Sequence, residues 1–129
     1  MKPLAIRTAA APAPGGHYSQ AIVSGGLVFV SGQLSIDPVS GERRTGPIAQ
    51  QTEMVLKNLA AILLASGSDL GHVLKTTIFI ADISLWGEVN EVYARVFGEH
   101  RPARSVVPTK ELHYGFLIEL EAIAAVKSA

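Results

Sequence analysis

The alternation of residue types over residues 116–126 is the feature that most constrains how this chain folds. Every even position is apolar, whereas Glu119 and Glu121 occupy odd positions. Successive side chains of a β-strand point to opposite faces of its sheet. The segment Phe116–Val126 is therefore predicted to be a strand with one face on a core and both glutamates on the other. The apolar positions are Phe116, Ile118, Leu120, Ala122, Ala124 and Val126.

Residue preferences elsewhere predict several more strands. Gly25-Gly26 separates two β-like runs and is typical of a hairpin. The unbroken apolar run Leu27–Val30 indicates a strand covered on both faces. We expect a loop over Leu34–Gly46, where turn-forming residues gather. The predicted strands are Leu4–Arg7, Gln20–Ser24, Leu27–Gln33, His72–Ile80 and Ser105–Thr109.

Two segments carry the apolar spacing of an amphipathic helix. The first runs from Pro47, a residue suited to the first helical turn, to about Ser66, and Gly67 ends it. The second runs from about Leu85 to Phe97, and Asn90 lies off its apolar side. The order of elements predicts an α+β sandwich, in which one mixed or antiparallel sheet is covered by two helices on one face.

Length and hydropathy indicate a single domain that associates with other subunits. A chain of 129 residues suits one domain over residues 1–129 with one core. Hydrophobic residues make up 48% of the chain, and the mean hydropathy is +0.30. Such a value is high for a small monomer, so we expect apolar surface to be buried between subunits.

Charge and cysteine content exclude several classes of function. The 11 basic and 11 acidic residues balance, which leaves no electrostatic footprint for nucleic acid or anionic membrane. The absence of cysteine excludes disulfides and thiol catalysis. No apolar run approaches the roughly 18 residues that span a bilayer, so we expect a cytoplasmic protein. The four histidines are not spaced as metal ligands, and no metal site is expected.

One arginine and one glutamate are the strongest candidates for a binding site. Arg104 in Pro102–Ser105 can hold a carboxylate through two parallel hydrogen bonds. Glu119 interrupts an apolar strand, where a charge is costly unless it is paired or used. On neighbouring strands the two would lie close together, either as a small-molecule site or as a plain ion pair. The polar end Ser31-Gly32-Gln33 of a buried strand is consistent with a pocket wall or a simple strand terminus.

A set of short motifs makes the chain resemble the RidA family, also called YjgF-type, of imine and enamine deaminases. The resemblance extends from about residue 5 to 127, and the motifs occur in the family's order. They are Tyr18-Ser19-Gln20-Ala21, Ser31-Gly32-Gln33, Gln51-Thr52, Asn58-Leu59, Lys75–Phe79, Val89–Tyr93, Pro102–Ser105 and Ile118–Ala124.

The resemblance implies both an assembly and a reaction. The fold would be chorismate-mutase-like, in a homotrimer around a β-barrel-like core with clefts between subunits. The reaction would be hydrolysis of 2-imino acids such as 2-iminopropanoate and 2-iminobutanoate to 2-oxo acids and ammonia. Pyridoxal-phosphate enzymes that release enamines would supply these substrates. No cofactor is implied, because the imine is already activated.

The resemblance also assigns roles to residues. Arg104 would hold the substrate carboxylate, and Glu119 would deprotonate the attacking water. Backbone groups around Val106 would complete the site. The substrate-binding set is Arg104, Tyr18, Ser31, Gly32, Asn90, Val106 and His113.

Three departures from the family pattern point to the origin of specificity. His17 replaces a proline, Val106 replaces a cysteine, and Leu112–Gly115 replaces a Leu-Pro turn. We expect the turn that contains His113 and Tyr114 to set which substrate is accepted.

Two other functions remain compatible with this resemblance. The first is an endoribonuclease or translation inhibitor, against which the balanced charge argues. The second is a non-catalytic ligand-binding or chaperone-like trimer, which would apply if the His113 turn blocked the cleft.

Overall fold

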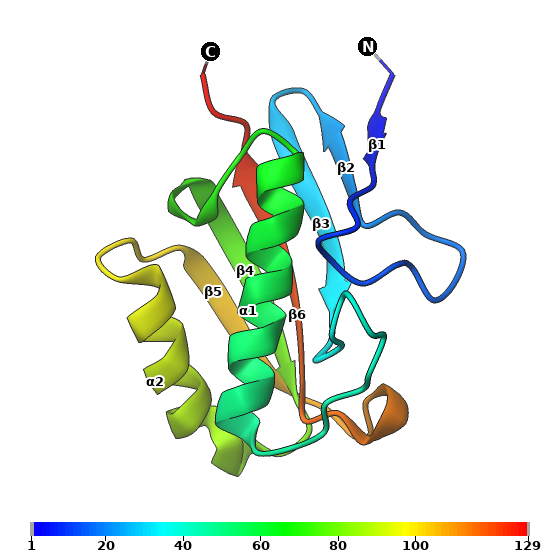
Figure 1. The fold of residues 1–129 in the computed structure, drawn as a ribbon. Coiled ribbons are helices and arrows are strands. Elements are labelled where there is room, and N and C mark those ends of the chain that lie inside the picture. Colours follow the sequence, from blue (N-terminus) through cyan, green and yellow to red (C-terminus); the bar gives the residue numbers. More distant parts are fainter. Residues whose placement is uncertain (1, 129) are drawn as a thin grey trace.

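A six-stranded mixed sheet with both α-helices on one face forms the fold of the computed structural model, which describes residues 2–128 (Figure 1). The strand order is β1-β2-β3-β6-β4-β5, and all neighbours are antiparallel except β4 and β5. The predicted α+β architecture is confirmed. The strands are β1 Leu4–Ile6, β2 Ala21–Ser24, β3 Leu27–Gln33, β4 Val73–Ile80, β5 Ala103–Pro108 and β6 Ile118–Ala125; the helices are α1 Ile48–Ala65 and α2 Trp86–Phe97.

The boundaries of several elements differ from those predicted. Strand β5 begins at Ala103 rather than Ser105, which places Arg104 inside the strand. Pro47 is the N-cap of α1 rather than its first helical residue. Asp82 accepts a hydrogen bond from the Ser84 amide, so it caps a 3₁₀ turn, Ile83–Leu85, that precedes α2. A second 3₁₀ turn, Leu70–His72, precedes β4.

The core lies between the two helices and the sheet face that they cover. The even positions of β6 are buried against it, as the alternation predicted: Ile118, Leu120, Ala122 and Ala124. Helix α1 contributes fully buried residues at helical spacing: Val55, Leu59, Ile62 and Leu63. Neither α1 nor α2, the α-helices of residues 2–128, has the length and apolar character needed to cross a membrane.

The opposite face of the sheet has no covering layer formed by residues 2–128 of the same chain. On it, Phe29 pairs with Ile123, and Phe79 pairs with Val107. Phe29 is 43% exposed and Val107 is 38% exposed. The prediction that Leu27–Val30 is covered on both faces is therefore wrong for a single chain, because both helices pack on the same side.

Two buried glutamines fix segments that precede strands β2 and β6. The Gln20 amide donates to the carbonyls of Thr8, Ala11 and Pro12, and its oxygen accepts from the Thr8 amide. Gln51 on α1 donates to the Gly46 carbonyl at 2.8 Å and accepts from the Leu117 amide at 2.9 Å. Gln20 thus holds the N-terminal arm, and Gln51 holds the entry to β6.

We predict that Gln51→Ala lowers the free energy of unfolding by about 2 kcal/mol or more, because it leaves the Gly46 carbonyl and the Leu117 amide without partners. Urea unfolding of the purified variant measures the loss. The control is Gln50→Ala at the neighbouring exposed position, with an expected change within about 0.5 kcal/mol. Equal stabilities of the two variants would contradict the role given to Gln51.

Candidate functional site

A hollow of about 820 Å³ lies where the N-terminal arm, the end of β3, the loop after it and the entry to β6 meet. Five residues predicted to form the site border it: Tyr18, Ser31, Gly32, His113 and Glu119. The volume is within the range of small-molecule sites. The His113 turn borders the hollow and leaves it open.

Glu119 projects from the uncovered face of β6 and lies against Gly32. A Cβ atom at position 32 would overlap the Glu119 Oε2 atom, so only glycine lets the carboxylate occupy this place. Burial raises the pKa of the Glu119 carboxyl above its ordinary value, and the nearby His113 counteracts that rise, while Glu121 adds to it. A carboxyl group with a raised pKa is suited to accept and return a proton.

The hydroxyl groups of the hollow differ in their availability. The Gly15 amide donates to the Tyr18 Oη atom at 3.1 Å, which leaves the phenol proton free to donate. Ser31 Oγ instead donates to the Ser19 carbonyl at 2.6 Å. Tyr18 can therefore bind a ligand as a donor, whereas Ser31 mainly ties β3 to the arm.

The turn His113–Gly115 has an unusual backbone. Tyr114 adopts φ of 57°, a left-handed conformation that a bulky residue rarely takes. Strain of this kind costs on the order of 1–3 kcal/mol and gathers at ligand sites. The Tyr114 ring lies edge-on to the buried Phe116 ring and beneath the guanidinium of Arg43.

Arg104 lies on the other side of the sheet. It pairs with Thr76 of β4, whose side chain is buried beneath the helices. Its Nη1 atom donates to Asn90 Oδ1 of α2 at 3.0 Å, and its Cζ atom is 4.8 Å from the centroid of the Tyr93 ring. Asn90 therefore orients Arg104. Val106 pairs with the buried Ile78, so its side chain faces the helix side too.

The prediction that Arg104 and Glu119 lie close together is wrong within one chain. Strand β4 lies between β5 and β6, so the two residues are not on neighbouring strands. Arg104 pairs with Thr76 of β4, whereas Glu119 pairs with Phe79 of the same strand. Because side chains alternate along a strand, Thr76 and Phe79 point to opposite faces of the sheet, and so do Arg104 and Glu119. A single chain thus presents the Glu119 carboxyl and the Arg104 guanidinium on different faces of the sheet.

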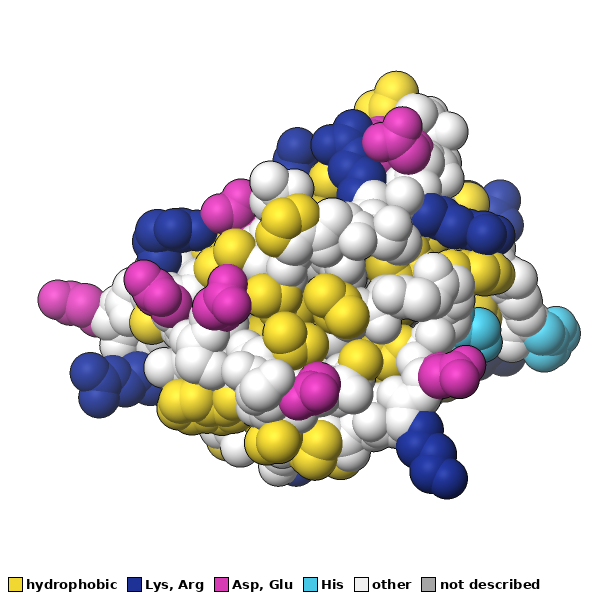
Figure 2. All heavy atoms as spheres, turned by 90° about the horizontal axis from the view of Figure 1, so that it is seen from below, with side chains coloured by type: hydrophobic (Ala, Val, Ile, Leu, Met, Phe, Trp, Pro, Cys, Tyr) yellow, Lys and Arg dark blue, Asp and Glu magenta, His cyan; other side chains and the backbone are white. Residues whose placement is uncertain are grey.

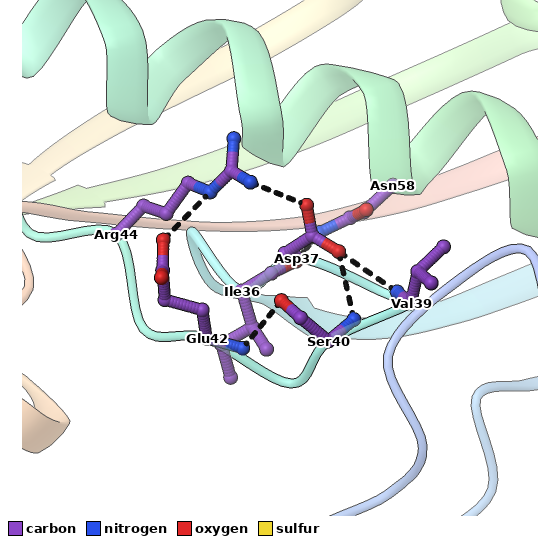
Figure 3. Close-up of polar contacts among 7 residues, drawn as sticks. All are labelled: Ile36, Asp37, Val39, Ser40, Glu42, Arg44 and Asn58. Atoms are coloured by element: carbon purple, nitrogen blue, oxygen red, sulfur yellow. Dashed lines mark hydrogen bonds and ion pairs between the residues drawn. The ribbon is translucent and has the colours of Figure 1, made fainter.

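Sequence reasoning gave no role to the loop over residues 36–44, which also borders the hollow (Figure 3). Asp37 accepts from the Val39 and Ser40 amides at 2.9 and 3.0 Å, and Arg44 donates to it at 2.7 Å. The Asn58 amide on α1 donates to the carbonyls of Leu34 and Ile36. No motif pointed to this loop; the departure from the family pattern at 112–115 pointed only to the turn whose Tyr114 ring contacts Arg43. Within residues 2–128, no three His, Asp or Glu side chains gather closely enough to hold a metal ion.

Comparison with known proteins identifies the family. The family model described as Endoribonuclease L-PSP matches residues 8–126. A RutC family protein of Pyrococcus horikoshii is 48% identical over 119 residues, covering 92% of this chain and 94% of that protein. The human protein named 2-iminobutanoate/2-iminopropanoate deaminase is 41% identical over 119 residues, covering 92% and 87%.

The chain belongs to the RidA family. Solved structures of the family share its fold closely. RidA of the Antarctic bacterium Psychrobacter has a TM-score of 0.92 at 38% identity, covering 95% of this chain and 99% of that one. E. coli TdcF, solved with bound serine, has a TM-score of 0.90 at 38% identity, covering 97% and 99%. The membership of the RidA family that the sequence motifs predicted is therefore confirmed.

We predict that Asp37→Asn destabilises the protein at pH 7 and that the difference from wild type shrinks in acid. The Ser40 and Val39 amides, and then Arg44, lower the pKa of Asp37 below its usual 3.8. A group with a lowered pKa stabilises the fold above its unfolded-state pKa and loses that effect as the pH falls through its folded-state value. Urea unfolding of wild type and Asp37→Asn at pH 7 and near pH 3 measures the stability difference at each pH. If the stability difference between wild type and Asp37→Asn stayed constant or grew in acid, the role given to the Asp37 carboxylate would be contradicted. Glu42→Gln in the same loop is the control.

Proposed function

We propose that the protein is a hydrolytic deaminase of 2-imino acids, and that it works as a homotrimer around a barrel-like core with residues 1–129 as one domain. The observation that carries this proposal is the position of Glu119, which lies against Gly32, borders the open hollow and has a carboxyl with a raised pKa. Relatives named 2-iminobutanoate/2-iminopropanoate deaminase support the substrate class. A cytoplasmic location stays a prediction.

The separation of Arg104 from Glu119 is the reason to place the site between subunits. Arg104 lies on β5, one of the two edge strands of the sheet, and the uncovered face carries exposed apolar residues. Burial of that face between copies would form the barrel-like core. A cyclic assembly brings different patches of neighbouring copies together. Arg104 and Asn90 of one subunit would thereby meet the Glu119 hollow of the next.

The reaction then divides between the two surfaces. Arg104 holds the substrate carboxylate through two charge-assisted hydrogen bonds, and Tyr18 and Gly32 line the cleft. Glu119 takes a proton from water as the oxygen bonds to the imine carbon and the C=N electron pair moves to nitrogen, and it then passes that proton to nitrogen to give a neutral carbinolamine. Glu119 next transfers the hydroxyl proton to the amino nitrogen, the C–N bond breaks with its electron pair on nitrogen as the C=O bond forms, and the 2-oxo acid and ammonia leave. Water is the only other reactant.

The chemistry of known ligands in the family agrees with this scheme. The serine bound to E. coli TdcF carries a carboxylate and a nitrogen on the same carbon, as a 2-imino acid does. An enzyme that releases enamines, as pyridoxal-phosphate-dependent dehydratases do, would supply the substrate after tautomerisation. We therefore expect a functional link to such enzymes.

The family description favours one competing function, RNA cleavage. Nucleic-acid binding needs clustered basic residues. In the view from below, acidic and basic side chains are interspersed around hydrophobic ones, without a continuous basic stripe on that face (Figure 2). Cleavage of RNA that is abolished by salt would support this alternative. The third candidate, a non-catalytic ligand-binding trimer, required a blocked cleft, and the open hollow beside His113 argues against it.

The deaminase proposal predicts different kinetic defects for its two main residues. Purified protein should speed the conversion of 2-iminobutanoate to 2-oxobutanoate when an amino-acid oxidase generates the imine in the assay. Arg104→Ala should raise KM, because it removes the carboxylate anchor. Glu119→Gln should lower kcat by about 10²–10⁴, the usual contribution of a positioned acid/base group. No acceleration by wild type, or full activity of both variants, would refute the proposal.

Gly32→Ala tests the placement of Glu119 without altering any polar group. We expect kcat to fall at least about tenfold, because the new methyl group displaces the acid/base residue. The free energy of unfolding should change by less than about 1 kcal/mol, since the displaced carboxylate is the end of a flexible side chain. Gly15→Ala is the matched control, because a methyl group there meets no atom within 4 Å. Equal activity of the two variants would contradict the geometry.

A further inference from the structure

We propose that Arg43 is a second anion-binding residue of the Glu119 hollow and that it selects 2-imino acids whose side chain carries a second carboxylate. This inference rests on the proposed function and extends it to a substrate class. Three features of the structure support it: the stacking of Arg43, the rigidity of its loop, and the way in which the surrounding charges are paired.

Arg43 is stacked flat on an aromatic ring at the wall of the hollow. Its Cζ atom lies 3.5 Å from the centroid of the Tyr114 ring, and both residues border the same hollow as Glu119. Stacking holds the guanidinium plane and leaves its N–H groups directed outward from the edge. A guanidinium presented in this way matches a carboxylate with two parallel hydrogen bonds.

Tyr114 is itself held in place by its surroundings. Its left-handed backbone is followed by Gly115, also at positive φ, and its ring is edge-on to the buried Phe116 ring at 6.1 Å. The turn therefore presents the ring as a fixed platform. This turn departs from the family pattern. A substrate specificity that differs from that of other family members is therefore expected to arise here.

The loop that carries Arg43 is fixed on both sides of it (Figure 3). The Asp37 carboxylate accepts hydrogen bonds from two backbone amides and from the Arg44 guanidinium. The Asn58 amide of α1 donates to the Leu34 and Ile36 carbonyls. An anchored loop needs little further ordering when a ligand binds, which favours affinity.

The pairing of charges leaves Arg43 available. Its neighbour Arg44 forms ion pairs with Asp37 and Glu42. Arg43 has no ion-pair partner within residues 2–128. The charged and titratable side chains that border the hollow are Arg43, Asp37, Glu119, His113, Tyr18 and Tyr114. Asp37 is occupied within its loop, so the hollow combines a reactive carboxylate with an unpaired cation.

This arrangement fits a ligand with two carboxylates. Arg104 of a neighbouring subunit would hold the carboxylate next to the imine carbon, and Arg43 would hold the distal one. An alkyl side chain forms no hydrogen bonds with a guanidinium, whereas a carboxylate forms charge-assisted hydrogen bonds with it. The hollow of about 820 Å³ has room for the longer side chain.

The test compares two imines generated in the assay. D-Aspartate oxidase with D-glutamate supplies 2-iminoglutarate, and D-amino-acid oxidase with D-2-aminobutyrate supplies 2-iminobutanoate. We expect wild type to have the higher kcat/KM for 2-iminoglutarate. Arg43→Gln should reduce the ratio of the two kcat/KM values by about 10- to 100-fold, as expected for a lost hydrogen bond to a charged group. Tyr114→Gly should reduce the same ratio, because it removes the platform.

Controls separate the role of Arg43 from other effects. Lys57→Gln removes one positive charge from the exposed surface of α1, away from the hollow, and should leave the ratio unchanged. Binding of 2-oxoglutarate and 2-oxobutanoate, measured by calorimetry, gives a readout that does not depend on turnover. Arg43→Gln should abolish the preference for 2-oxoglutarate.

Two outcomes would overturn the inference, and they can be told apart. If wild type hydrolyses 2-iminobutanoate but has no preference for 2-iminoglutarate, or if Arg43→Gln lowers both kcat/KM values equally, the role of Arg43 is refuted and the deaminase function stands. If wild type hydrolyses neither imine, the proposed function fails and this inference fails with it.

Discussion

The strict alternation of side chains across a β-sheet is the constraint on which the candidate site depends. It places Glu119 on the uncovered face of β6, while Arg104 on β5 pairs with the buried Thr76 and faces the helices. No rotamer change brings together two side chains on opposite faces of a sheet with a strand between them. The chemistry proposed for this RidA-family chain therefore needs a second copy of the same chain.

Hydrogen-bonded polar side chains make each half of the proposed site rigid before any assembly forms. Gln20 fixes the arm that carries Tyr18, Gln51 fixes the entry to β6, and Asn58 fixes the loop before Arg43. On the other face, Asn90 holds the Arg104 guanidinium beside Tyr93. Preorganised groups of this kind lose little freedom when substrate binds, so the binding free energy is available for orientation.

The sequence predicted local features well and the relation between distant elements poorly. The alternation in β6 correctly assigned buried Ile118 and Leu120 and the exposed side of Glu119, because it depends only on neighbouring residues. The expected proximity of Arg104 and Glu119 failed because strand order and register arise from contacts far apart in the sequence. The stacking of Arg43 on Tyr114 was missed for the same reason, since it joins a loop to a turn that only the fold brings together.

Complementation between two defective variants tests the two-subunit site most directly. At a substrate concentration far below the raised KM of Arg104→Ala, the Arg104→Ala and Glu119→Gln chains are each expected to have little activity, and they are co-expressed in equal amounts so that mixed trimers form. A site between subunits is restored wherever a chain with Arg104 adjoins a chain with Glu119, which random assembly gives at about a quarter of the sites. We predict about a quarter of the wild-type activity in the mixture. Activity no higher than that of the separate variants, in mixtures shown by mass spectrometry to contain both chains, would contradict the account.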